Sequence, residues 1–343
     1  MKLRSYYIAL AAGFLSLPVV LGTLNDNKSA TFVNALEKRS GVFEGHRRAH
    51  AKGICGLGSF ISNGNGAAYT SALFAQPGSE SSVTFRFSLG GSNPFAPDSR
   101  RAFRSMALML EQPDGYQWRT AMNHVPVFII KNPVDFPLLH LAHVADPATG
   151  KPDPAKVKAF FDARPETKAM RHWMKNGPLP SSFTTSKFYG VNAFIFENEQ
   201  GEHTVARWQF VPEEGEDSLS AAQLKTLAAD ALFKGLRAQF PGPPKRWTLE
   251  LQLAGKEDDE RDPTVKWPDT REIVSLGTLE LTSLEEQPGG VCEAINFDPL
   301  ILPPGILPSG DPVLYARSAA YNISVERRLS EQEISKKPEG VAK

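Results

Sequence analysis

A histidine in a basic segment is the first candidate for chemistry in this chain. His50 lies in the run RRAHAKG at residues 47–53, and imidazole is the side chain best suited to moving protons near neutral pH. A lone histidine is more often structural or at the surface than catalytic. His50 is therefore a candidate acid/base whose role depends on what the fold places beside it.

An arginine and a serine share one face of a predicted strand. Apolar residues alternate from Val83 to Leu89, which is typical of a strand with one face in the core. Arg86 and Ser88 are two residues apart and therefore point together to the other face. That face is either solvated, which is the commoner arrangement, or part of a polar site.

A third pair of polar residues lies near the C-terminus. Arg317 and Tyr321 are spaced i,i+4, and they touch if residues 314–325 form a helix. An arginine beside a phenol favours the phenolate, which is a hard anionic ligand for ferric iron. Spacing alone does not demonstrate iron, and a surface Arg/Tyr pair is the default interpretation.

Stretches with strand patterns recur along the chain and must form the frame that positions these residues. The pair at 188–196 and 203–210 flanks a turn-prone polar segment, which predicts a hairpin. About eight strands in sequence-adjacent, mostly antiparallel order predict a closed barrel. The clearest of these stretches are residues 83–89, 103–110, 124–130, 188–196, 203–210, 247–253 and 276–284.

Helices interrupt this order rather than alternate with it. Asp153-Pro154 predicts a helix start, and the helical stretch is broken at Pro165 and ended by residues 176–178. Residues 220–223 have the form of a capping box and open a second helix that Pro241 stops. The layout is α+β. Because no glycine-rich phosphate loop follows a strand, a nucleotide-binding sheet is not supported.

The charge and the cysteines limit the classes of function. Lys plus Arg and Asp plus Glu each number 38, so no net field draws the chain to nucleic acid or to an anionic membrane surface. The sequence has no CxxC, HExxH or paired Cys/His spacing that predicts a zinc site. Cys55 and Cys292 either form a single bridge or, the favoured interpretation, are two unrelated buried thiols.

The first 30 residues have the order of an export signal. Lys2 and Arg4 precede an apolar run from residue 6 to residue 22, and polar residues follow. The run is close to the roughly 20 residues that span a bilayer, so it is either a cleaved signal or a retained membrane anchor. We therefore expect a periplasmic or exported protein, which an uncleaved segment would tie to the inner membrane.

Four segments resemble motifs of the haem catalase family, in the same order and spacing. His50-Ala-Lys-Gly53 resembles that family's distal histidine segment, and Arg86-Phe-Ser88 resembles its serine strand. Asn123-His-Val-Pro-Val-Phe128 resembles its distal asparagine segment, and Arg317-Ser-Ala-Ala-Tyr321 resembles its proximal tyrosine helix. The resemblance covers roughly residues 40–330. It implies one catalase-like haem domain over residues 31–343, an antiparallel eight-stranded β-barrel with inserted and C-terminal helices.

The resemblance implies a catalytic role for three residues. His50 would be the distal acid/base, which takes a proton from one peroxide oxygen and returns it to the other. Ser88 would hydrogen-bond to the imidazole and orient it. Asn123 would hold the second peroxide oxygen.

The resemblance also implies a set of haem-binding residues. Tyr321 would be the axial ligand of the iron in haem b, Arg317 would keep the tyrosine ionised, and Asp311 would orient Arg317. Phe128 and Phe136 would line the distal face and the channel. Three arginines match the family's propionate-binding positions, which suits their fork geometry: Arg47, Arg86 and Arg328.

The implied activity is that of a peroxidase with weak catalase activity, and the chain resembles the small catalase-related peroxidases. Typical catalases continue well beyond the tyrosine helix, so a more open pocket is expected, which an organic donor can reach. The expected partners are a peroxide and a small organic reductant, without nucleic acid or a stable nucleotide cofactor, in a monomer or small homo-oligomer. True catalase activity, lipid-hydroperoxide rearrangement and non-enzymatic haem binding are the alternatives.

Overall fold

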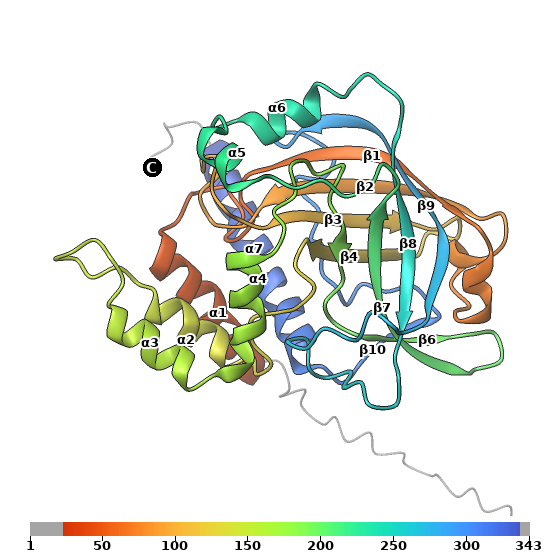
Figure 1. The fold of residues 1–343 in the computed structure, drawn as a ribbon, viewed down its shortest axis with the longest axis horizontal. Helices are drawn as coiled ribbons and strands as arrows, with labels where there is room; N and C mark the ends of the chain where they lie inside the picture. Colours follow the sequence, from red (N-terminus) through yellow and green to blue (C-terminus); the bar gives the residue numbers. More distant parts are fainter. Residues whose placement is uncertain (1–22, 337–343) are drawn as a thin grey trace, which may run out of the picture.

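A closed antiparallel barrel frames the protein. The computed structural model describes residues 23–336, and its ring consists of β1 (Gly53–Ser62), β2 (Glu80–Leu89), β3 (Arg104–Glu111), β4 (Gln117–Asn123), β5 (Phe188–Tyr189), β7 (His203–Pro212), β8 (Lys245–Leu253) and β9 (Ile273–Glu286). Each strand pairs antiparallel with its neighbours, and β7 pairs with β8 to close the ring (Figure 1). Two short strands, β6 (Phe194–Glu197) and β10 (Ile306–Pro308), extend the sheet beyond β7. The predicted α+β fold with an eight-stranded barrel is confirmed.

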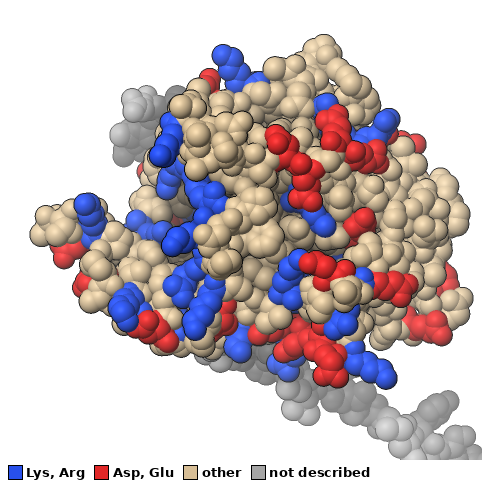
Figure 2. Space-filling view, in the orientation of Figure 1, with Lys and Arg blue, Asp and Glu red and all other residues tan. Residues whose placement is uncertain are grey.

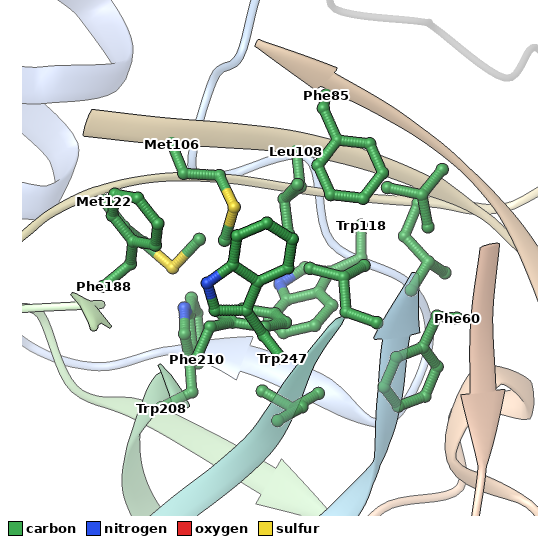
Figure 3. Packing of buried hydrophobic residues seen from close by; sticks show 14 of the residues in the cluster. Phe60, Phe85, Met106, Leu108, Trp118, Met122, Phe188, Trp208, Phe210 and Trp247 are labelled. Carbon is green, nitrogen blue, oxygen red and sulfur yellow. The ribbon is translucent and has the colours of Figure 1, made fainter. Parts of the chain in front are cut away.

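Aromatic side chains fill the interior of the barrel. The predicted alternation on β2 buries Phe85 and Phe87 completely. Figure 3 shows rings from several strands packed against one another, and the ring centroids of Trp118 and Trp208 are 4.8 Å apart. Trp247 packs in the same way against Phe85, with centroids 6.4 Å apart. Because the interior is a densely packed apolar core, polar chemistry must lie outside it.

The predicted strands are wrong where local turn chemistry interrupts the apolar pattern. Residues 124–130 are not a strand, because β4 ends at Asn123. The Val125 N–H donates a hydrogen bond of 2.7 Å to the Asn123 side chain, a local bond that competes with the sheet ladder. The predicted strand at 188–196 is divided into β5 and β6.

The helices begin largely where their caps predict. The side chain of Asp153 accepts a hydrogen bond from the Ala155 N–H at the start of α3 (Pro154–Asp162), and Ser220 forms the predicted capping box at the start of α5 (Ala221–Thr226). The stretch after Ser220 is two helices instead of one, since α6 (Ala231–Arg237) starts after a break. The other helices are α1 (Thr23–Ser40), α2 (Asp135–Ala142), α4 (Lys168–Asn176) and α7 (Pro312–Lys336). α1 packs against α2 and α7, beside the barrel (Figure 1).

A disulfide joins Cys55 on β1 to Cys292 in the segment after β9, with Cα atoms 5.4 Å apart. The favoured expectation of two unrelated thiols is therefore wrong. Strand pairing explains the error, because β1 lies beside β9 and places Cys55 opposite Glu285. No sequence pattern predicts β1, which contains several glycines; a Cβ added to Gly58 would lie 1.8 Å from the Glu280 carbonyl oxygen on β9.

The N-terminal prediction remains a prediction. The apolar run of residues 6–22 lies outside the described residues, and α1 begins at Thr23, before the expected start of the folded domain. Within residues 23–336, no helix is both long enough and apolar enough to cross a membrane.

Charge is distributed unevenly although the net charge is zero. Figure 2 shows a stripe of lysine and arginine side chains alongside α4. This helix carries Lys168, Arg171 and Lys175 and no acidic residue. Arg101 donates hydrogen bonds to backbone carbonyls at the C-terminal end of the same helix. This face is locally basic and attracts anions.

Candidate active site

His50 and Ser88 meet at one end of β2. The Ser88 hydroxyl oxygen lies 3.5 Å from His50 Nδ1, at the outer limit of a hydrogen bond. Ser88 and Arg86 are each 3% exposed, so a solvated outer face for this part of β2 is excluded. Because Nδ1 faces Ser88, Nε2 is the ring nitrogen available to a substrate.

The backbone at His50 is held in an uncommon conformation. Its φ is +55°, and no other non-glycine residue of the described chain has a positive φ. Such a conformation costs about 1–3 kcal/mol and persists only where the surroundings fix it. Ion pairs flank the residue on both sides: Arg48 with Glu37 of α1 at 2.7 Å, and Lys52 with the buried Asp98 at 2.5 Å. These contacts hold the imidazole in place.

Electrostatics keep the imidazole neutral. Burial, followed by the charges of Arg86 and Arg317, lowers the pKa of His50 to about 4. At pH 7 the ring therefore carries a proton on one nitrogen and a lone pair on the other. This is the protonation state that a general base requires.

Arg86 is a buried cation without an acidic partner. Its guanidinium donates to the carbonyl oxygen of His50 at 2.6 Å and to the side-chain oxygen of Gln287 at 2.6 and 2.9 Å. Gly53 makes room for it, since an added Cβ would lie 2.6 Å from Arg86 Nη2. Burial, followed by the charge of Arg328, lowers the pKa of Arg86 to about 9.

Two further arginines extend this positive cluster. Arg328 on α7 is 2% exposed, and its Nε and Nη2 atoms have no hydrogen-bond partner. Within residues 23–336, Arg47 donates to backbone carbonyls, and its buried Nε also has no partner there. Burial, then Arg86 and Arg328, lowers the pKa of Arg47 well below its usual value.

The cluster of Arg47, Arg86 and Arg328 lacks the anion that buried cations require. Buried charges are normally paired, because an unpaired one costs several kcal/mol. Within the described chain none of the three makes an ion pair with a carboxylate, and the nearby Glu293 accepts hydrogen bonds from Gly289 and Gln332 instead. The orphaned donors therefore fit a ligand that brings its own carboxylates.

Tyr321 lies on the same helix as Arg328 and close to the cluster. It packs against the buried group formed by Cys55, Cys292 and Phe297. Its phenol is near enough to Arg47 and Arg86 to act on the pKa of both. The predicted helix is confirmed as α7, and Tyr321 is partly buried on it instead of lying at the surface.

Arg317 and Asp311 are connected through a residue that the sequence pattern did not indicate. The Asn192 side chain donates to Asp311 at 2.6 Å and accepts from the Arg317 guanidinium. Arg317 also donates to the Ala121 carbonyl oxygen at 3.0 Å. Asp311 therefore orients Arg317 indirectly, through the Asn192 amide.

The remaining predicted residues, Asn123, Phe128 and Phe136, lie at the end of β4 and in the segment that follows it. Asn123 ends β4, pairs with Ser105 in the ladder and uses its side-chain oxygen for the local turn. Phe128 follows in irregular structure, where its N–H bonds to the Pro263 carbonyl. Phe136 lies on α2 with its ring against Phe32 and His140. Among the described residues the ring contacts of Phe136 are with Phe32 and His140 and not with His50, so its role in a channel stays a prediction.

Sequence patterns missed Asn192 and Gln287 for different reasons. Asn192 lies in the irregular stretch between β5 and β6, where the only sequence signal is Gly190, which interrupts the strand pattern. Gln287 follows the end of β9 and is a common polar residue in a loop. Both contacts join residues far apart in sequence, so neither has a local signature.

Comparison with known proteins identifies the family of this chain. The catalase family model matches residues 35–335. A catalase-related peroxidase of Synechococcus elongatus is 38% identical over 326 residues, covering 93% of this chain and 96% of that protein; one of Mycolicibacterium paratuberculosis is 29% identical over 299 residues, covering 86% and 93%. A fungal catalase structure superposes with a TM-score of 0.76 at 23% identity, over 96% of this chain and 67% of that one. The chain belongs to the catalase family.

Proposed function

We propose that this protein is a haem-dependent peroxidase that reduces hydrogen peroxide or organic hydroperoxides with electrons from a small organic donor. The catalase family implies a haem cofactor. The observation that carries the proposal is the cluster of Arg47, Arg86 and Arg328, which lacks an anion, beside a neutral histidine. Haem has two propionates, and these would supply the missing carboxylates.

The residues around the cluster fit a non-covalently bound haem b. Arg328 and Arg47 have orphaned donors for the propionates, and Tyr321 would supply a phenolate ligand to the iron. The chain has two cysteines and both are in the disulfide, so neither is available for the thioether bonds of a c-type haem. When bound, haem supplies a redox-active iron that can cleave a peroxide bond and accept electrons.

The distal residues would manage the protons of the peroxide. His50 Nε2 accepts a proton from one peroxide oxygen and delivers it to the other, which leaves as water. Ser88 at Nδ1 holds the ring in place, and the Asn123 amide would hold the second oxygen. Reduction of one hydrogen peroxide to two waters uses two protons and two electrons, and the organic donor supplies both electrons.

The proximal residues would maintain the phenolate. Arg317 lies one helical turn before Tyr321, where its positive charge would favour binding of the tyrosine to iron as an anion. The Asn192 bridge to Asp311 keeps the Arg317 guanidinium from rotating away. Two relatives that this chain matches over most of their length are named catalase-related peroxidases, which supports an organic donor over a second peroxide.

The location and assembly are part of the same proposal. We infer that residues 6–22 direct the protein out of the cytoplasm, as a cleaved signal or as a membrane anchor. The disulfide supports an oxidising compartment, because such bonds are rare in the cytosol. We infer a monomer or a small homo-oligomer.

The first test is a visible spectrum of the protein from haem-supplied cells, followed by peroxide with and without an aromatic donor. We expect a ferric haem spectrum and donor oxidation that far exceeds oxygen release. Vigorous oxygen release would instead identify a catalase, and rearranged lipid hydroperoxides without donor consumption would identify an isomerase. Absence of haem would refute the proposal.

Arg328→Leu tests the cation cluster. Removing a charge-assisted contact to a propionate should weaken haem binding about 10-fold or more, whereas removing an unpaired buried cation should raise the denaturation midpoint of the apoprotein. Haem dimethyl ester, which lacks the carboxylates, should bind the parent and the variant equally. Arg171→Leu on α4 is the control. Unchanged haem affinity in Arg328→Leu would exclude this residue as a propionate partner.

His50→Ala tests proton transfer. Haem should stay bound, while the reaction with peroxide slows by roughly 100-fold or more, the scale of a lost general acid/base; stopped-flow spectra measure this rate. In the parent the rate should fall as the pH approaches 4, because the protonated ring cannot accept a proton. The exposed His172→Ala is the control. Equal rates in both variants would remove His50 from the mechanism.

Tyr321→Phe tests the axial ligand. Loss of the phenolate should change the visible spectrum or empty the pocket, because phenylalanine offers no donor atom to the iron. Tyr315→Phe removes a half-exposed hydroxyl from the same helix and should leave the spectrum unchanged. A Tyr321→Phe protein with the parent spectrum would exclude Tyr321 as ligand.

A further inference from the structure

The disulfide lies directly behind the predicted haem ligand. Cys55 and Cys292 are both 0% exposed. They form a small apolar cluster with Phe297, and Tyr321 packs against it together with Ile295. This cluster is separate from the aromatic core of the barrel, and Ala107, Met109 and Ala121 on β3 and β4 also pack against it.

The segment that carries Cys292 also holds an arginine of the cation cluster. We call residues 292–297 the shelf. Arg47 donates to the carbonyl oxygens of Cys292 at 3.1 Å, Glu293 at 3.2 Å and Ile295 at 2.9 Å. Its guanidinium also lies 5.6 Å from the centre of the Phe297 ring. The position of Arg47 therefore depends on the backbone of the shelf.

The other ties between the shelf and the rest of the fold are noncovalent. The segment follows the end of β9 and has no helix or strand of its own. Arg119 on β4 donates to the Asn296 carbonyl oxygen at 2.6 Å, the Asn296 amide donates to Asn322 on α7 at 2.7 Å, and Gln332 donates to Glu293 at 3.1 Å. Irregular segments with few buried contacts open more readily than the core. The bond from Cys292 to Cys55 is the covalent tie to β1.

We propose that the Cys55–Cys292 disulfide is a positioning element of the haem site. It fixes the shelf against β1, so that Arg47 stays aimed at a propionate and Tyr321 keeps its packing. The two cysteines act through these residues and do not touch the reacting atoms. The inference rests on the proposed haem site. It predicts that loss of the cross-link loosens the shelf and speeds haem loss while the barrel stays folded.

The test uses the double variant Cys55→Val/Cys292→Ala, which keeps apolar side chains at both positions. Hydrogen exchange in the apoprotein should be at least about 10-fold faster in residues 288–298, while β2 and β8 stay protected. Transfer of haem to excess apomyoglobin should also be about 10-fold faster. Leu251→Ala is a core substitution on β8, outside the cluster of Cys55, Cys292 and Phe297. It controls for general loss of stability.

The outcomes separate the two proposals. Equal exchange and equal haem transfer in the double variant and in Leu251→Ala would overturn the positioning role, even if the parent binds haem well. Failure of the parent to take up haem would overturn the proposed function and the inference with it. Faster exchange in the shelf together with faster haem transfer supports the inference.

A second measurement needs no variant. Linkage is reciprocal, so a disulfide that strengthens haem binding about 10-fold must itself be stabilised about 10-fold by the bound ligand. The parent protein is equilibrated with dithiothreitol, a dithiol that becomes a cyclic disulfide as it converts Cys55–Cys292 to two thiols. Zinc protoporphyrin, which carries the same propionates and is not reduced, replaces haem. An unchanged equilibrium with and without the porphyrin would refute the inference.

Discussion

Three positive charges without acidic partners in the described chain are the constraint on which this site depends; Arg86 and Arg328 are buried and Arg47 is partly buried. Burial lowers the pKa of all three arginines; Arg328 lowers the pKa of Arg86 further, and both lower that of Arg47. Neutral acceptors such as the Gln287 side chain satisfy the cluster only in part. A fold selected for stability alone would pair or remove such charges. The same field helps to keep His50 neutral, so one cluster both selects an anionic ligand and sets the protonation state of the base.

The barrel supplies the rigidity that this arrangement needs. Its aromatic interior is apolar and filled, so β1 and β2 are held rigidly, and Ser88 and Arg86 lie on β2. Ion pairs on either side of His50 fasten its loop to Glu37 of α1 and to Asp98 in the segment between β2 and β3. α7 then brings Tyr321 and Arg328 to the same place. The left-handed backbone conformation of His50 persists because the contacts of the neighbouring residues fix it.

Local chemistry made much of the frame predictable. The alternation on β2 predicted a buried strand face, and the caps at Asp153 and Ser220 predicted helix starts, because these signals depend on residues close in sequence. The strand predicted at 124–130 was wrong because the turn at Asn123 outweighs an apolar run. β1 was not predicted because its glycines are required by the close approach of β9, and no local sequence pattern indicates that approach.

Periodicity and motif order in the sequence predicted most of the strands and helices, the family resemblance and the candidate residues. Only the tertiary structure decided that Arg86 and Ser88 are buried, that Cys55 and Cys292 are bonded, and that Asn192 joins Arg317 to Asp311. The reason is physical: burial, cross-linking and hydrogen bonding between distant residues are set by strand pairing and helix packing, which only the closed barrel fixes.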